Sequence, residues 1–338
     1  MLPLNKRTLS LILSIFSLAA AALWAEQQNV TRPAGSKAAA QTDQTEDSGA
    51  IFRSDTRVVV CPTTVVDKDG HLVTNLPKSA FTVYEDKEPQ KFTMKREDVP
   101  VSLGLIVDNS GSMREKRKKV ETAALDLVVA SNKDDEVFVV NFNDSAYLDL
   151  PHEKDFTNDI EEMKEALARI DARGGTAMRD ALNMSIVHLK EKAHRDKRVL
   201  VVVTDGVDNS SIISLEALVK VAQQSGVLIY AVGLLTDEDR RDATRAKREL
   251  DSLTEATGGR AFFPKELADV EHIAQEVARD IRNQYTIAYT PSNAALDGTF
   301  RAIKIVVNAP GHPTVRTRTG YYATPDQAQN NKPAGASK

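Results

Sequence analysis

The fold is decided by an apolar run with a polar end: Val101-Ser102-Leu103-Gly104-Leu105-Ile106-Val107, followed by Asp108-Asn109-Ser110-Gly111-Ser112. An apolar run of this kind predicts a strand that is buried on both faces, as in a parallel sheet. The polar cluster follows its carboxyl end, which is where open α/β sheets bind their ligands. One carboxylate and two hydroxyls on a tight turn form a compact set of oxygens, which suits a small hard cation such as Mg²⁺.

Outward from this strand, apolar strands and amphipathic helices alternate from residue 101 to about residue 283. We expect strands at Leu103–Val107, Val137–Phe142, Val199–Thr204, Val227–Val232 and Ala261–Phe263. After a first helix that buries Val120, Ala124, Leu127 and Val128, we expect helices at Ile160–Ile170, Met178–Lys192, Leu215–Gln224, Leu250–Thr257 and Leu267–Arg282. This alternation predicts a doubly wound α/β domain with a mostly parallel sheet that is covered on both faces.

Segments with β patterns flank the α/β part on both sides. Strands are expected at Arg57–Val66, Phe81–Tyr84, Gln90–Lys95, Gln284–Tyr289, Phe300–Asn308 and Val315–Tyr322. Each flank is too small to bury a core alone. We therefore expect residues 51–99 and 285–322 to pair into one discontinuous β-sandwich, with an inserted domain at 100–284. Two separate β appendages on the α/β domain are the alternative.

The two ends of the chain are expected to lie outside the folded part. Lys6 and Arg7 precede an apolar stretch over residues 8–18 and an alanine-rich stretch that ends at Ala25, which is the pattern of a signal peptide over 1–25. Ala22 is an alternative cleavage site, and an uncleaved membrane anchor is an alternative to cleavage. The mature chain would then be exported, to the periplasm, the cell surface or the medium, without a membrane span. Residues 26–50 and 323–338 have the composition of disordered segments.

The composition argues against a nucleic-acid partner and excludes an intramolecular disulfide bond. The 338 residues carry a formal net charge of −4 and no basic stripe with interleaved aromatic residues, which argues against a nucleic-acid partner. The basic run at 116–119 is interpreted as the solvated first turns of a helix. Cys61 is the single cysteine, so an intramolecular disulfide is impossible, and we expect it to be a small buried hydrophobic residue. Asp67 and Asp69 are interpreted as turn residues rather than a calcium site.

Two more loops should meet the first one at the same edge of the sheet. Gly174-Gly175-Thr176 precedes a helix and presents one hydroxyl, and Asp205 follows the apolar strand at Val199–Thr204. With these loops the candidate ligands of a cation are five: Asp108, Ser110, Ser112, Thr176 and Asp205. The alternative is that Ser110, Ser112 and Thr176 only cap helices.

The five candidates, in this order and on these loops, resemble the von Willebrand factor type A family over residues 101 to about 283. More narrowly, the chain is similar to exported bacterial proteins in which β segments flank such a domain. The resemblance implies a metal-ion-dependent adhesion site in which Ser110, Ser112 and often the threonine bind the cation directly, while the carboxylates act mostly through water. It implies Mg²⁺, with Mn²⁺ or Ca²⁺ as alternatives, and a protein partner that presents an Asp or Glu carboxylate.

The predicted function is therefore metal-dependent binding of a protein rather than catalysis. Phosphate-binding glycine motifs are missing from the sequence, and its histidines are scattered without zinc spacing. Two alternatives stay open: a β-sandwich scaffold with a purely structural metal, and a metal-dependent hydrolase. By analogy with relatives, a shift of the helix at Leu267–Arg282 could tilt the flanking β-sandwich.

Overall fold

The structure is a computed structural model that describes residues 58–96, 98–151, 154–168, 172–235 and 240–325. The signal peptide predicted at 1–25, the linker predicted at 26–50 and residues 326–338 of the predicted tail lie outside these residues. Within the described part of the chain, no helix is both long enough and apolar enough to cross a membrane.

A six-stranded sheet forms the centre of the α/β part, in the order β10-β9-β8-β5-β6-β7. Its strands are β5 (Val101–Asp108), β6 (Glu136–Phe142), β7 (Ala146–Leu148), β8 (Lys197–Thr204), β9 (Leu228–Gly233) and β10 (Ala261–Phe262). All neighbours pair in parallel except β7, which runs antiparallel to β6. The chain passes from β5 to β6 on one side and later returns to β8 on the other. The carboxyl end of β5 therefore lies at a topological switch point.

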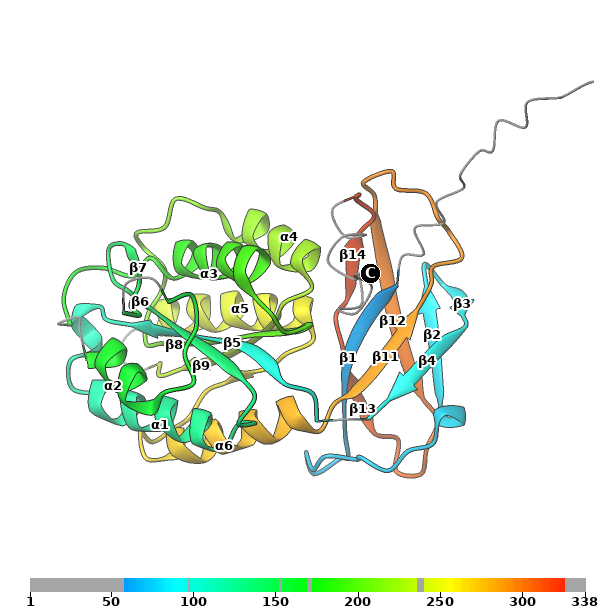
Figure 1. The fold of residues 1–338 in the computed structure, drawn as a ribbon, viewed down its shortest axis with the longest axis horizontal. Coiled ribbons are helices and arrows are strands. Elements are labelled where there is room, and N and C mark those ends of the chain that lie inside the picture. The colour runs from blue at the N-terminus through cyan, green and yellow to red at the C-terminus, as the bar shows by residue number, and fades with distance from the viewer. Residues whose placement is uncertain (1–57, 97, 152–153, 169–171, 236–239, 326–338) are drawn as a thin grey trace, which may run out of the picture. The chain divides into compact units, whose positions relative to one another are not determined.

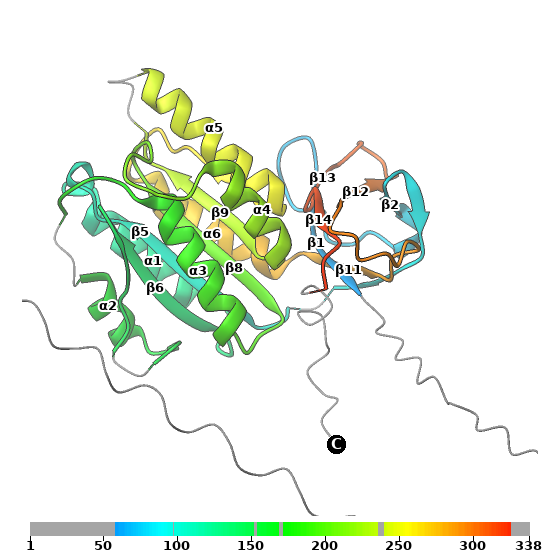
Figure 2. The same ribbon diagram turned by 90° about the horizontal axis from the view of Figure 1, so that it is seen from above.

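Helices cover both faces of this sheet (Figures 1 and 2). They are α1 (Arg117–Val129), α2 (Ile160–Ala168), α3 (Met178–Lys192), α4 (Leu215–Ser225), α5 (Arg240–Thr257) and α6 (Asp269–Arg282). Helices α1, α2 and α6 lie on one face and α3, α4 and α5 on the other. The predicted fold class, a doubly wound and mostly parallel α/β sheet flanked by β structure, is confirmed.

Helix α5 begins at Arg240, although the apolar pattern predicted a start at Leu250. Its first half buries only Ala246, so it has no apolar stripe for a pattern search to find. Arginine, alanine and lysine have high helix propensity, which explains why the helix extends through this polar stretch.

The flanking segments form two four-stranded antiparallel sheets, β13-β1-β11-β4 and β14-β12-β2-β3. Their strands are β1 (Val59–Val66), β2 (Phe81–Glu85), β3 (Glu88–Gln90), β4 (Phe92–Lys95), β11 (Tyr285–Tyr289), β12 (Phe300–Val307), β13 (Thr314–Arg316) and β14 (Gly320–Tyr322). One apolar core joins both sheets, with Cys61, Val83, Ile287 and Ile305 among its members. Cys61 is buried and unbonded as expected, and burial raises the pKa of its thiol to about 12.

Two strands that the pattern predicted as continuous are each divided between the two sheets. The stretch at Gln90–Lys95 holds the end of β3 and all of β4, and the stretch at Val315–Tyr322 holds the end of β13 and all of β14. At the second division the chain is turned by Arg318, whose guanidinium donates to the Gly320 and Gln223 carbonyls. Residue alternation continues through both crossings, so the sequence pattern alone does not reveal them. The domain boundaries at 99/100 and 284/285 stay a prediction.

Candidate functional site

The first candidate residue, Asp108, ends the central strand β5 and is completely buried. Its Oδ1 accepts a 2.7 Å hydrogen bond from the Ser110 backbone N–H. Its Oδ2 accepts a 2.6 Å bond from the Thr204 hydroxyl, at the end of the neighbouring strand β8. These two bonds hold the carboxylate between the loop that carries Ser110 and strand β8, which leads into the loop of Asp205.

A continuous series of oxygen contacts runs from the first loop to the third. The Ser110 and Ser112 hydroxyls lie 3.1 Å apart, and the Ser112 hydroxyl donates to Asp205 Oδ1 at 2.7 Å. Ser110 is buried, whereas Ser112 is exposed. The structure thus brings three of the five candidates into direct contact, with one hydroxyl open to solvent.

Thr176 is buried beside this cluster, and other groups link it to the two loops. Its Oγ1 is 3.8 Å from the position that a Cβ would take on Gly206, the residue after Asp205. In the same loop, the Gly174 carbonyl accepts a 3.2 Å bond from the Gly111 N–H. Gly174 has a φ of +75°, which a glycine adopts without strain. The second loop is therefore tied to both of the others, although no described hydrogen bond joins the Thr176 hydroxyl to them.

The electrostatics of the cluster centre on Asp108. Its pKa is raised from 3.8 to about 6, chiefly because burial disfavours the charged carboxylate. The hydrogen bonds from Thr204 and Ser110 oppose this rise, and the nearby charge of Asp205 adds to it. Among the described residues no lysine, arginine or histidine pairs with Asp108. A cation at this edge would stabilise its charged form.

Lys116 is a member of this site that the sequence analysis missed. Its ammonium group donates to Asp205 Oδ2 at 2.6 Å and to the Leu234 carbonyl at 3.4 Å. Its side chain is 22% exposed, so the interpretation of the whole basic run as a solvated face is wrong for this residue. The available signal was its position one helical turn after Ser112, which places it on the same side of the chain.

The hydroxyls do not act as helix caps. Ser110 precedes the short 3-10 helix at Gly111–Met113 but makes no side-chain cap hydrogen bond. The residue at the N-cap of α3 is Ala177 rather than Thr176. The candidate set thus offers two carboxylates and three hydroxyls, all of them hard oxygen ligands, around a buried acid without a cationic partner. This donor chemistry fits a divalent cation such as Mg²⁺.

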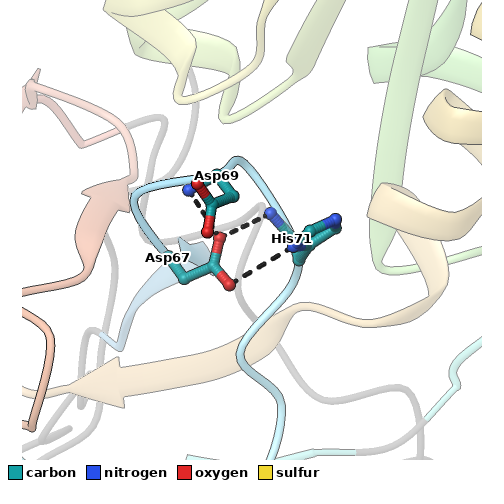
Figure 3. Close-up of side chains that lie close together, drawn as sticks. All are labelled: Asp67, Asp69 and His71. Atoms are coloured by element: carbon teal, nitrogen blue, oxygen red, sulfur yellow. Dashed lines mark hydrogen bonds and ion pairs between the residues drawn. The ribbon is translucent and has the colours of Figure 1, made fainter.

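A second acidic group lies in the flanking sheets, where Asp67, Asp69 and His71 gather on an exposed turn (Figure 3). Asp67 Oδ1 accepts 2.9 Å hydrogen bonds from the backbone N–H groups of Asp69 and His71. Lys68 forms an ion pair with Asp69 at 2.9 Å. These contacts are those of a polar turn, as the sequence analysis expected.

Two histidines that were considered for catalysis have contacts elsewhere. His188 Nε2 lies 2.8 Å from the Asp155 carbonyl, and its ring packs against Phe138. His194 is paired with Glu136. Among the described contacts, neither joins the oxygen cluster.

Comparison with known proteins shows which family the chain is similar to. The family model of the von Willebrand factor type A domain matches residues 103–276. Calcium-activated chloride channel regulator 1 of Sus scrofa is 28% identical over 211 residues, which cover 57% of this chain and 21% of that protein. The chain thus spans about a fifth of the length of that curated relative.

Two solved structures show similarity at low sequence identity. One is von Willebrand factor type A from Catenulispora acidiphila, with 15% identity, a TM-score of 0.45, and coverage of 79% of this chain and 75% of that one. The other is proximal thread matrix protein 1 from the mussel byssus with a zinc-occupied MIDAS motif. It has 16% identity, a TM-score of 0.45, and coverage of 59% of this chain and 50% of that one.

Proposed function

Because the chain belongs to the von Willebrand factor type A domain family, we propose that it is a metal-ion-dependent protein-binding module and not an enzyme. Five residues would hold one divalent cation, Mg²⁺ in the first place and Mn²⁺ or Ca²⁺ as alternatives: Asp108, Ser110, Ser112, Thr176 and Asp205. When bound, the cation supplies a coordination position that attracts an Asp or Glu carboxylate of a protein partner.

One observation carries this proposal: the contacts from Ser110 to Ser112 to Asp205 lie beside a buried carboxylate that no described cation neutralises. A purely structural serine pair would bond to backbone groups or cap a helix. Here each serine hydroxyl instead contacts another side-chain oxygen. Oxygens held this close together are stabilised when they share a cation.

The surrounding residues have supporting roles in this proposal. Asp108 holds the first loop through the Ser110 N–H and holds β8 through the Thr204 hydroxyl. Lys116 instead occupies one oxygen of Asp205, where its charge competes with a cation, and leaves the other to Ser112. Ser112, the exposed member, lies at the surface where a partner can approach.

We also propose the domain organisation in which residues 100–284 form the binding domain and residues 51–99 and 285–322 form one discontinuous sandwich. The antiparallel pairing of β1 with β11 supports it, since Cys61 lies opposite Ile287. Export of the protein is proposed from the pattern of residues 1–25 alone.

The cation site is tested by calorimetric titration of the full chain with MgCl₂. We expect Ser112→Ala to weaken Mg²⁺ binding by about 10- to 100-fold, as is typical when a supporting contact of a metal site is lost. Ser225→Ala is the matched control, because this serine is the last residue of α4 and its hydroxyl bonds locally, donating to the Ala222 carbonyl and accepting from the Val227 N–H. Equal Mg²⁺ affinity in Ser112→Ala and the wild-type chain would refute the site.

The bridging role is tested by a pull-down from the organism's own cell extract, with Mg²⁺ or with EDTA, followed by mass spectrometry. We expect a partner that is captured only with Mg²⁺ and is lost in Asp108→Ala. If EDTA lowers the melting temperature while the captured partner is unchanged, the metal is structural. The function then passes to the flanking sheets as a scaffold.

A further inference from the structure

Next to the proposed cation site lies a hollow of about 600 Å³ with a strongly basic wall. It is lined by the beginnings of three helices: Arg179 on α3, Ser214 to Glu216 at α4, and the first half of α5. The arginines among its lining residues are Arg179, Arg240, Arg241, Arg245 and Arg248, against the two acids Glu216 and Glu249. Among these lining residues the basic side chains therefore outnumber the acidic ones, on a chain whose formal net charge is −4.

Three of the arginines on α5 line the hollow without a hydrogen-bonded or ion-paired carboxylate among the described residues. Arg240, Arg245 and Arg248 are exposed, and no hydrogen bond or ion pair joins them to a carboxylate of a described residue. Helical spacing places Arg241 and Arg245 one turn apart, with Arg248 one turn further on. Guanidinium groups in such a row suit several carboxylates of one ligand, since each can form a bidentate pair.

The floor of the hollow is rigid and buried. Arg179 donates to Asp208 Oδ1 at 3.0 Å, and its Nε lies 3.5 Å from Glu249 Oε1. Glu249 is 6% exposed, and its Oε1 has no hydrogen-bond partner among the described residues. Arg179 is thus held by Asp208, with the Glu249 carboxylate beside it, while Arg240, Arg245 and Arg248 on the wall remain available to a ligand.

Two short chain segments join residues at the hollow to ligands of the proposed cation site. Arg179 follows Thr176 by three residues, and its partner Asp208 follows Asp205 by three residues. Helices α3, α4 and α5 all begin at the carboxyl edge of the sheet. The positive ends of their dipoles therefore add to the potential that attracts anions there.

An acidic peptide is the ligand that this chemistry favours. The lining contains no aromatic side chain on which a nucleic-acid base could stack. A flat membrane surface would not enter a hollow, whereas an extended peptide can. The proposed cation site already selects a partner carboxylate, and neighbouring acidic residues of the same partner would meet the arginines.

We propose that this arginine-lined hollow is a second binding site, which holds an Asp- and Glu-rich segment of the protein partner. The inference rests on the proposed function, because it assigns both sites to one partner. The cation site then supplies one strong contact, and the hollow selects partners whose bridging carboxylate lies in an acidic segment.

The test uses the full chain and a fluorescein-labelled peptide of alternating glutamate and glycine, with fluorescence anisotropy as the readout, in Mg²⁺ and in EDTA. We expect the double variant Arg245→Gln/Arg248→Gln to weaken peptide binding about tenfold in both buffers. Arg245→Lys/Arg248→Lys, which keeps the charge, should recover part of the affinity. Lys91→Gln/Lys304→Gln removes the same charge from exposed positions on the flanking sheets and should bind as the wild type does.

Three results would overturn the inference. The first is no binding of the peptide by the wild-type chain, and the second is an equal loss of affinity in Arg245→Gln/Arg248→Gln and in the control Lys91→Gln/Lys304→Gln. The third is binding of phosphatidylserine vesicles in place of the peptide. Melting temperatures equal to that of the wild type show that the exposed arginine variants are folded. The two proposals fail separately. Loss of the Mg²⁺ dependence alone refutes the cation bridge, whereas loss of the arginine dependence alone refutes the hollow.

Discussion

Two buried carboxylates, in different regions of this molecule, each accept two hydrogen bonds but lie in different surroundings. Glu85, in the core between the flanking sheets, is 3% exposed and accepts hydrogen bonds from the hydroxyls of Tyr289 at 2.7 Å and Tyr321 at 2.8 Å. Tyr289 belongs to one sheet and Tyr321 to the other, so the carboxylate joins the two sheets. Both of its partners come from strands.

Asp108, at the edge of the central sheet, is equally buried and also accepts two hydrogen bonds, but the Asp205 carboxylate lies close enough to raise its pKa. Its two hydrogen bonds do not overcome the effect of burial, since its pKa is raised to about 6. The comparison shows how a buried acid reveals its role. Where only hydrogen-bond donors face the acid, it supports the fold; where a second carboxylate lies nearby, the acid is suited to a cation.

The largest expected effect on the free energy of unfolding comes from replacing Glu85. Glu85→Ala should lower the free energy of unfolding by about 4 kcal/mol, because it leaves two tyrosine hydroxyls in the core without a partner. Urea unfolding of the full chain measures this change, and Glu85→Gln, which keeps one acceptor oxygen, should lose less. A loss below about 1 kcal/mol in Glu85→Ala would mean that this carboxylate does not support the fold.

The opposite sign is expected for Asp108. In EDTA near neutral pH, Asp108→Asn should raise the free energy of unfolding by about 3 kcal/mol, which corresponds to a pKa of about 6 in the fold against 3.8 ordinarily.

The same shift predicts how the stability of the chain without metal depends on pH. The folded wild-type chain keeps the Asp108 proton to higher pH than the unfolded chain does. Its unfolding free energy should therefore fall as pH rises from about 4 to about 6. Urea unfolding across this range should show the fall in the wild type and a smaller one in Asp108→Asn. A destabilised Asp108→Asn chain would contradict the comparison.

A smaller loss is expected from the strand that carries Asp108. A Cβ on Gly104 would lie 2.5 Å from Phe138 Cζ and 2.6 Å from Leu200 Cδ2, both on neighbouring strands. Gly104→Ala should therefore destabilise the chain by about 2 kcal/mol through overpacking. Thermal unfolding followed by circular dichroism measures the loss, and an unchanged melting temperature would show that these side chains repack without strain.

The smallest effect concerns the ammonium group on Asp205. Lys116→Gln removes a positive charge from the proposed cation site and should tighten Mg²⁺ binding about fivefold, or about 1 kcal/mol. Calorimetric titration measures it, with the exposed Lys118→Gln as the matched control. Weaker Mg²⁺ binding in Lys116→Gln would instead show that this lysine positions Asp205 for the cation.

The fold class was predictable because its signals are local. The apolar run that ends at Asp108 and the periodicity of the helices mark each element without knowledge of its neighbours. The polar half of α5 and the two crossings between the flanking sheets escaped prediction. The first has no apolar stripe, and the crossings keep the alternation of a single strand.

The candidate ligands were likewise visible as polar residues that follow buried strands, but their surroundings were not. Some contacts join residues that lie far apart in the chain. Examples are the ion pair of Lys116 with Asp205 and the hydrogen bonds from two tyrosines to Glu85. No spacing in the sequence encodes such contacts.

By itself, then, the sequence determined that this chain forms a parallel α/β sheet with oxygen ligands at one edge, because strand periodicity and strand ends are local properties. Only the tertiary structure decided which oxygens touch and that the Lys116 ammonium pairs with Asp205. It also decided that the arginines of α5 line a hollow beside the proposed site. The physical reason is that contact and burial arise when distant segments pack together, and the pKa of Asp108 follows from that packing.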